Sequence, residues 1–161
     1  MNLNLTDPPS AVHDIVLSRY VVKVAGIEAI IISDGILTPP AESIATNADP
    51  VTRNAWLDEC FLDHKAFDWA LNAVVVRSGN QTILVDSGLG EEYPDFSRAG
   101  QFVSRLEAAG VDFHSVTDIV LTHTHFDDVC GLLASGVKER LGSGIRVDEP
   151  LKWYLFQHRL G

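Results

Sequence analysis

Residues 118–128 read Asp-Ile-Val-Leu-Thr-His-Thr-His-Phe-Asp-Asp, and this stretch decides the fold. Its first part is a short apolar run, which is typical of a buried strand. His123 and His125 follow as the chain leaves that strand. Side chains two apart in extended backbone point the same way, so both rings, and by the same spacing Asp127, can converge on one point. Two imidazoles and a carboxylate are ligands that suit zinc and its first-row neighbours.

A second apolar strand, residues 82–85, precedes Asp86 and a glycine-rich loop. Residues 102–109 then show the spacing of an amphipathic helix. The order strand, helix, strand predicts that residues 119–121 run parallel to residues 82–85 within a mixed sheet. Asp86 and His123 would then follow the carboxyl ends of neighbouring strands, where open α/β sheets commonly bind ligands.

Two hairpins and one helix are predicted in the first half of the chain. The hairpins are formed by strands 20–24 and 27–32, with Gly26 supplying the turn, and by strands 70–76 and 82–85. The triplet Ser33-Asp34-Gly35 is predicted to end the second strand. Asp49 is a plausible N-cap before Pro50, and the helical spacing of apolar residues continues to His64.

Residues 119–132 resemble the His-x-His-x-Asp-His segment of the metallo-β-lactamase superfamily. Residues 72–76 and 83–88 resemble its preceding strands, especially in relatives of methyl parathion hydrolase and the acyl-homoserine lactonases. The similarity covers about residues 20–141. It implies an α/β (α+β) fold, the N-terminal half of an αβ/βα sandwich, with a mixed sheet and flanking helices.

The resemblance also implies a set of site residues. His123 and His125 would bind a first metal, and Asp127 would bind a second metal and transfer protons. Asp86 would orient the ligands from outside the coordination shell, although a turn residue that merely ends the strand is an equal alternative. The expected cofactor is one or two Zn²⁺ ions, with Mn²⁺ or Fe²⁺ as alternatives. The implied reaction is hydrolysis of a lactone, ester or phosphotriester by a metal-activated water.

Two positions depart from the family pattern. Asp128 stands where the family has a second-site histidine. An aspartate can bind a metal, but it is shorter than histidine and adds negative charge beside Asp127, which weakens the second site. Cys130 stands where the family has the first glycine of a Gly-Gly pair. A small packed apolar residue is the favoured interpretation of Cys130, and a soft ligand is the alternative.

The family takes its further ligands from a second half of the fold. The chain is therefore expected to be a single, apparently truncated domain over residues 1–161, with a flexible N-terminus over residues 1–15. His158 is the only histidine after the motif, and a terminal strand or frayed end is favoured over a third ligand. The other histidines lack ligand spacing and are interpreted as surface or core residues: His13, His64 and His114.

Composition limits the partners of the chain. Its 12 basic and 22 acidic residues give a net charge of −10, which argues against nucleic acid and anionic membranes and favours a small neutral or cationic substrate. Residues 1–10 lack the features of a secretory signal, so the cytoplasm is the expected location. Cys60 and Cys130 are expected to be reduced thiols.

Two alternatives to a hydrolase remain open. The first is a truncated or degenerate relative without catalysis, which binds at most a metal or a partner. Half a sandwich would expose an apolar sheet face, so a homo-oligomer through that face is expected. The second is a redox or nucleotide-binding α/β domain with residues 88–90 as a phosphate loop, although the Gly-x-Gly-x-x-Gly pattern is incomplete.

Overall fold

The computed structural model describes residues 18–91, 93 and 95–147. Its strands are β1 (Arg19–Val24), β2 (Ile27–Leu37), β3 (Trp69–Ser78), β4 (Gln81–Val85), β5 (Asp118–Val120) and β6 (Arg146–Val147). Its α-helices are α1 (Pro50–Glu59), α2 (Phe102–Ala108), α3 (Phe126–Val129) and α4 (Val137–Arg140). Short 3₁₀ turns lie at Ala41–Ser43, Phe113–Ser115 and Cys130–Leu133. Among these described helices, none has both the length and the apolar character needed to cross a bilayer.

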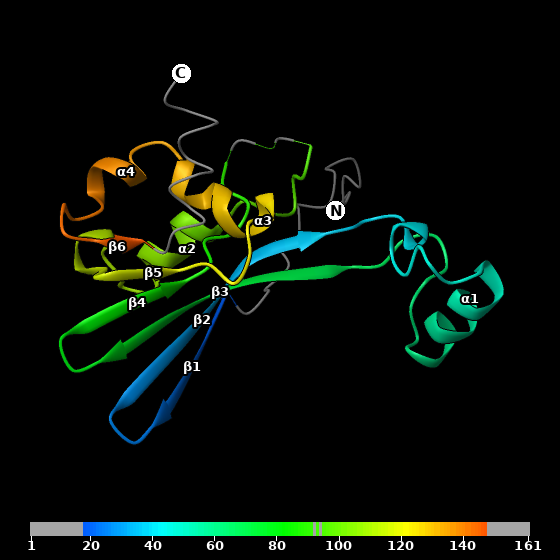
Figure 1. The fold of residues 1–161 in the computed structure, drawn as a ribbon, viewed down its shortest axis with the longest axis horizontal. Coiled ribbons are helices and arrows are strands. Elements are labelled where there is room, and N and C mark those ends of the chain that lie inside the picture. The colour runs from blue at the N-terminus through cyan, green and yellow to red at the C-terminus, as the bar shows by residue number, and fades with distance from the viewer. Residues whose placement is uncertain (1–17, 92, 94, 148–161) are drawn as a thin grey trace, which may run out of the picture.

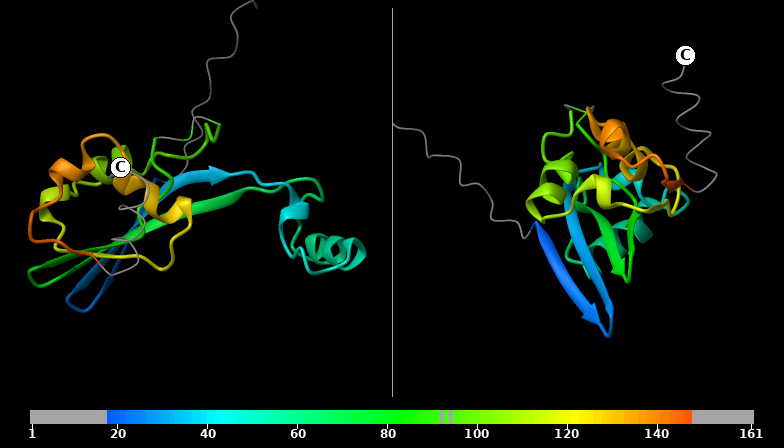
Figure 2. Two further views of the ribbon diagram at one scale, coloured as in Figure 1. Left: turned by 45° about the horizontal axis from the view of Figure 1, so that its top comes forward. Right: turned by 90° about the vertical axis from the view of Figure 1, so that its left-hand side faces the viewer.

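The strands form one sheet in the order β1-β2-β3-β4-β5-β6 (Figure 1). Strands β1 to β4 pair antiparallel, whereas β4, β5 and β6 run parallel. Helices α2, α3 and α4 lie on the same side of this sheet, and α1 lies apart at the far end of β2 and β3 (Figures 1 and 2). The mixed sheet with flanking helices that the sequence predicts is therefore confirmed.

The predicted hairpins are present, with local differences. Strand β2 continues to Leu37 because a bulge between Ser33 and Gly35 absorbs the irregular triplet, so the predicted strand end there is wrong. Ala25, with φ of 52°, takes the left-handed conformation in the first turn instead of Gly26. Asp49 caps α1 as predicted by accepting two backbone N–H groups, but the helix ends at Glu59, before His64.

The core lies between one face of the sheet and helices α2, α3 and α4. The register places Ile30, Val75, Leu84 and Ile119 side by side across four strands, and all four are buried. They pack against buried side chains from the helices and their connections: Phe102, Val103, Leu106, Phe113, Val129 and Val137. Burial of these apolar side chains is the main stabilising contribution to the fold.

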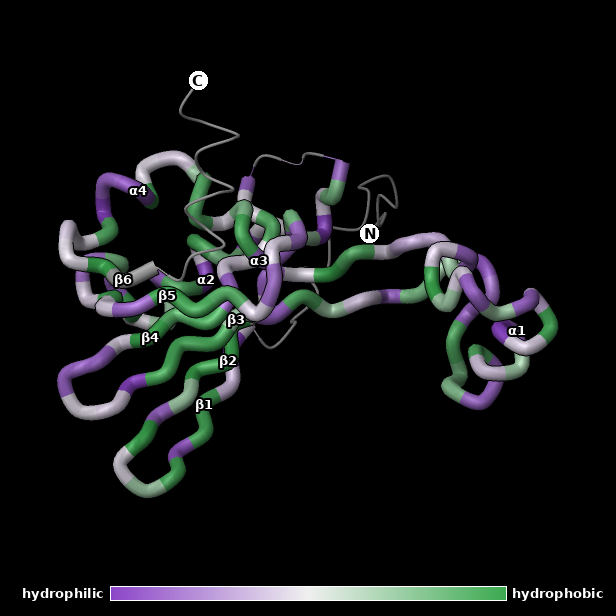
Figure 3. Tube along the Cα trace, viewed as in Figure 1, coloured by the Kyte–Doolittle hydropathy of each residue, from purple (hydrophilic) through white to green (hydrophobic). Residues whose placement is uncertain are grey.

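The opposite face of the sheet is also apolar. A second row crosses it one residue along, consisting of Tyr20, Ile31, Val74, Val85 and Val120. Tyr20 is 65% exposed and Val120 is 40% exposed, and the other three are half-buried. Figure 3 shows this hydrophobic character along the central strands. The exposed apolar face expected from the sequence is present, and the homo-oligomer inferred from it stays a prediction.

A buried carboxylate joins three segments of the fold. Asp34 is fully buried within β2. Its Oδ1 atom accepts a hydrogen bond from the Phe102 N–H at 2.7 Å, and its Oδ2 atom accepts from the N–H groups of Leu89 at 3.0 Å and Gly100 at 3.2 Å. A Cβ atom on Gly88 would lie 2.6 Å from the Asp34 carboxyl carbon. Asp34 thus connects β2 to the loop after β4 and to the start of α2.

Replacing Asp34 by alanine is expected to lower the free energy of unfolding by at least about 3 kcal/mol, because each buried donor left unpaired costs ~1–3 kcal/mol. Urea unfolding followed by circular dichroism measures this loss. Asp112→Ala is a matched control, since Asp112 caps an exposed 3₁₀ turn through the N–H of His114. That variant should lose about 1 kcal/mol. Equal losses in the two variants would contradict the central role of Asp34.

Candidate metal centre

The pairing of β4 with β5 determines where the candidate site lies. Val85 is in register with Val120 in the parallel pair, as the order of elements predicts. The pairing extends one step further, because the Asp86 N–H donates to the Val120 carbonyl at 2.9 Å. The segments that follow the two strands therefore leave the sheet side by side, at its carboxyl edge.

The loop after β4 fixes the start of α3. Both the backbone N–H and the hydroxyl of Ser87 donate to the carbonyl of Asp128, at 2.7 and 2.8 Å. The Gly131 N–H donates to the Gly88 carbonyl at 3.0 Å, and a Cβ atom on Gly131 would collide with the Ser87 carbonyl. Glycine is needed at position 131 because two backbones meet there.

Cys130, in place of the first family glycine, is accommodated in the core. It is 1% exposed, and its Sγ atom lies 3.5 Å from the Tyr93 hydroxyl. The interpretation of Cys130 as a packed residue is confirmed. Among the described residues, neither Cys60 nor Cys130 forms a disulfide, as expected.

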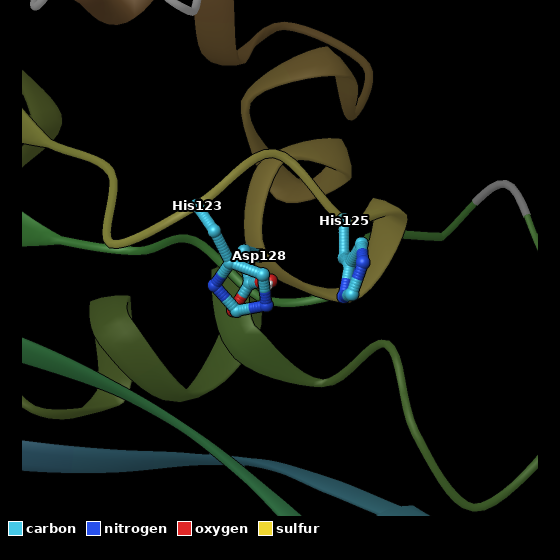
Figure 4. A group of neighbouring side chains, drawn as sticks. All are labelled: His123, His125 and Asp128. Carbon is cyan, nitrogen blue, oxygen red and sulfur yellow. Dashed lines mark ion pairs between the residues drawn. The ribbon is translucent and has the colours of Figure 1, made fainter. Parts of the chain in front are cut away.

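The two histidines of the motif lie together, and Asp128 joins them. Figure 4 shows the rings of His123 and His125 extending in the same direction from the segment between β5 and α3. One ligand atom from each of His123, His125 and Asp128 lies within 4.8 Å of the others. Within the described part of the chain, the group that could hold a metal ion does not include Asp127, whose side chain is half-buried.

The change from extended to helical backbone explains this placement. Helix α3 begins at Phe126, directly after His125. The two-residue alternation therefore applies from His123 to His125 and stops before Asp127. Successive helical residues are separated by about 100° around the axis. Asp128 consequently points toward the histidines, in a direction that spacing in extended backbone does not predict.

The carboxylate of Asp128 lies in a partly buried, negatively charged environment. Its Oδ2 atom is buried, accepts no hydrogen bond from the described residues, and lies 3.1 Å from the Nε2 atom of His123. Burial raises the pKa of Asp128 to about 6, and the negative charges of Asp127 and Asp86 act in the same direction. An ion pair with His123 forms only when the ring is protonated. A divalent cation would satisfy the buried oxygen and both imidazoles, so these residues fit a metal.

Asp86 contacts the motif through Thr122. Its Oδ1 and Oδ2 atoms accept hydrogen bonds from the backbone N–H and the hydroxyl of Thr122, both at 2.8 Å. The Thr122 hydroxyl oxygen also lies 3.0 Å from the Nδ1 atom of His123. Sequence reasoning included Asp86 and missed Thr122. The available signal was its position, immediately before His123 and opposite Asp86 at the ends of parallel strands.

Three aromatic rings lie beside the candidate site. Phe126 follows His125 directly, and its ring centroid is 5.5 Å from that of Tyr93 and 6.1 Å from that of Phe96. Phe96 and Phe126 are each 38% exposed. Sequence reasoning missed this cluster because Tyr93 and Phe126 are 33 positions apart along the chain.

The phosphate-loop interpretation of residues 88–90 is wrong. The N–H of Leu89 donates to the carboxylate of Asp34, and the Leu89 side chain is fully buried. A carboxylate therefore occupies the position that a phosphate would need. The surface interpretation is confirmed for the exposed residues His64, paired with Asp58, and His114, paired with Asp112. His13 and His158 lie outside the described residues.

Comparison with known proteins identifies the fold. The sequence model of the metallo-beta-lactamase superfamily matches residues 67–134, which include the histidine motif. The chain has the fold of this superfamily. The resemblance inferred from the motif is thereby confirmed. A comparison with curated proteins found no match.

Three solved structures illustrate the similarity. AidC, a dizinc quorum-quenching lactonase in complex with a product, is 25% identical, with a TM-score of 0.67, over 81% of this chain and 44% of AidC. The hydrolase AbOPH has a TM-score of 0.71 and is 23% identical, over 88% of this chain and 48% of AbOPH. A probable metal-dependent hydrolase from Staphylococcus aureus has a TM-score of 0.65 and is 12% identical, over 86% of this chain and 52% of that hydrolase. The chain thus spans about half the length of these structures.

The geometry of the centre distinguishes the two neighbouring aspartates. Asp128→Ala is expected to weaken Zn²⁺ or Co²⁺ binding at least about tenfold, because loss of a ligand should exceed the ~10-fold lower bound for residues outside the coordination shell. Asp127→Ala is the matched control and should have the smaller effect. Isothermal titration calorimetry, with Co²⁺ absorption spectra as a second measurement, tests the order. Weaker binding by the Asp127 variant would contradict the geometry.

Proposed function

We propose that this chain carries the catalytic metal centre of a hydrolase that acts on a lactone, an ester or a phosphotriester. The observation that supports the proposal is the convergence of His123, His125 and Asp128 at the carboxyl edge of two parallel strands. The match to the superfamily and the similarity to AidC, whose name describes a lactonase, support the reaction class.

His123, His125 and Asp128 would hold a divalent ion, with Zn²⁺ the first expectation and Mn²⁺ or Fe²⁺ as alternatives. A bound ion of this kind lowers the pKa of a coordinated water and polarises a carbonyl or phosphoryl oxygen. The three side chains leave coordination positions open, which hydrolytic sites require. The number of ions is part of the proposal, since Asp127 would be available for a second one.

Asp127 is proposed to move the proton that hydrolysis releases. It lies in the first turn of α3, beside Asp128 in sequence, and its side chain is half-buried. A carboxylate so placed can accept a proton from the attacking water and return it to the leaving group. Asp86 acts further out, because its carboxylate is occupied by Thr122. We propose that it positions the site without contact with the substrate.

The surroundings of the site favour an uncharged, partly apolar substrate. Tyr93, Phe96 and Phe126 form an aromatic cluster around the residue that follows His125, and two of these rings are partly exposed. The net charge of −10 disfavours anionic ligands, apart from the local field of a bound ion. A lactone with an acyl chain or an aryl ester satisfies both conditions.

A second function remains as the alternative. Asp128 replaces a histidine of the family pattern, and a carboxylate donates more negative charge to a metal than an imidazole does. The metal then becomes a weaker Lewis acid. On this alternative, the chain binds a metal or a partner without turnover.

Turnover of a generic lactone, an aryl ester and a phosphotriester by the metal-loaded protein tests the proposal. We expect His123→Ala to lower kcat/KM at least about 100-fold, because even residues outside the coordination shell cost ~10–100-fold. His114→Ala is a matched control, since His114 is an exposed histidine paired with Asp112. It should retain wild-type activity. Metal-loaded protein no more active than His123→Ala would favour the alternative.

A further inference from the structure

A continuous chain of hydrogen bonds reaches the metal group from the neighbouring strand. Asp86 accepts from both the N–H and the hydroxyl of Thr122, each at 2.8 Å. The Thr122 oxygen lies 3.0 Å from Nδ1 of His123. On the other side of the ring, Nε2 of His123 lies 3.1 Å from Oδ2 of Asp128. The imidazole is therefore held between a threonine and a candidate metal ligand.

The direction of each hydrogen bond follows from the donors available. A carboxylate has no hydrogen to donate, so both Asp86 oxygens accept. The Thr122 hydroxyl has one hydrogen, and Asp86 receives it. Toward His123, the hydroxyl oxygen can only accept, so the ring must carry a hydrogen on Nδ1. A neutral imidazole has one ring hydrogen, so this arrangement leaves a lone pair on Nε2, which faces Oδ2 of Asp128 at 3.1 Å, with both atoms available to one cation.

We propose that Thr122, anchored by Asp86, is a positioning residue that holds His123 in the Nδ1–H tautomer, with Nε2 free to bind the metal. The inference rests on the metal centre of the proposed function, but the tautomer can be measured without a metal. Hydrogen bonds from outside the coordination shell are a general means of selecting a histidine tautomer and ring orientation.

The anchor is rigid, which suits this role. Asp86 holds Thr122 through two hydrogen bonds to a single residue, and its own N–H is bound to the Val120 carbonyl at 2.9 Å. Its backbone has φ of 55°, a left-handed conformation that costs energy outside glycine and persists only where the surroundings impose it. The position of the His123 ring is thus fixed relative to the ends of two paired strands, β4 and β5.

Nitrogen-15 NMR tests the tautomer directly in the metal-free Asp128→Ala protein, because this background removes the carboxylate that would compete for the ring hydrogen at Nε2. The measurement is made at about pH 9, above the ordinary pKa of imidazole. In this background, the His123 signals should show hydrogen on Nδ1 and a bare Nε2. Thr122→Val removes the acceptor and should abolish this preference, whereas Thr122→Ser keeps the hydroxyl and should retain it. His125 is an internal reference, because its ring is not part of this hydrogen-bond chain.

Asp86→Asn gives the most discriminating result. The single amide oxygen is needed by the Thr122 N–H, so the amide NH₂ would face the Thr122 hydroxyl. The hydroxyl then donates its hydrogen to Nδ1 of His123, and the ring hydrogen moves to Nε2. In the same Asp128→Ala background, the expected spectrum is the reverse of the one obtained with Asp86 unchanged. Simple loss of packing would not produce a reversed tautomer, so this outcome separates positioning from a structural role.

Metal affinity supplies the second measurement. Calorimetric titration with Zn²⁺ should give wild-type affinity for Thr122→Ser, and affinity about 10–100-fold weaker for Thr122→Val and Asp86→Asn. A ring with hydrogen on Nε2 in the Asp128→Ala background, or an unchanged spectrum and affinity on Thr122→Val, would overturn the inference. Neither measurement depends on turnover. An inactive protein with the expected tautomers would refute the proposed function and leave this inference standing.

Discussion

The buried carboxylate of Asp34 joins the segments that must meet before a metal centre can exist. It binds the start of α2 and the loop after β4, both far from β2 in sequence. A buried carboxylate is tolerated only when its oxygens are satisfied, and here three backbone N–H groups fill that role. The same contacts remove the N–H groups of a glycine-rich loop from any anion. Asp34 thereby prevents this loop from binding an anion through those N–H groups.

Hydrogen bonds connect the loop after β4 to the segment that carries the candidate ligands. Ser87 holds the carbonyl of Asp128, and Gly131 closes against the loop from the other side. The pairing of β4 with β5 fixes the position of Asp86 beside the motif. None of these contacts involves a group that would take part in the reaction. Together they place exposed histidines and a half-buried aspartate within reach of one ion.

The sequence predicts most of the architecture because its signals are local. Alternating apolar residues identify the strands, and the short crossover implies the parallel pair. The sequence predicts Asp34 to be a turn residue because its partners, among them Phe102, are distant in sequence. Spacing along an extended chain favours Asp127 over Asp128 as a ligand, whereas α3 begins after His125 and brings Asp128 to the histidines. The sequence pattern does not show non-local contacts or the change from extended to helical backbone after His125.

The left-handed backbone of Asp86 has a consequence for how this position can change in evolution. Glycine and asparagine tolerate such a conformation best, and neither offers two acceptor oxygens. Glutamate offers both oxygens but has a longer side chain and no such backbone tolerance. The residues at 86 and 122 should therefore drift only as a pair, with each constraining the substitutions open to the other. A strained backbone at one strand end would in this way preserve a threonine on the next.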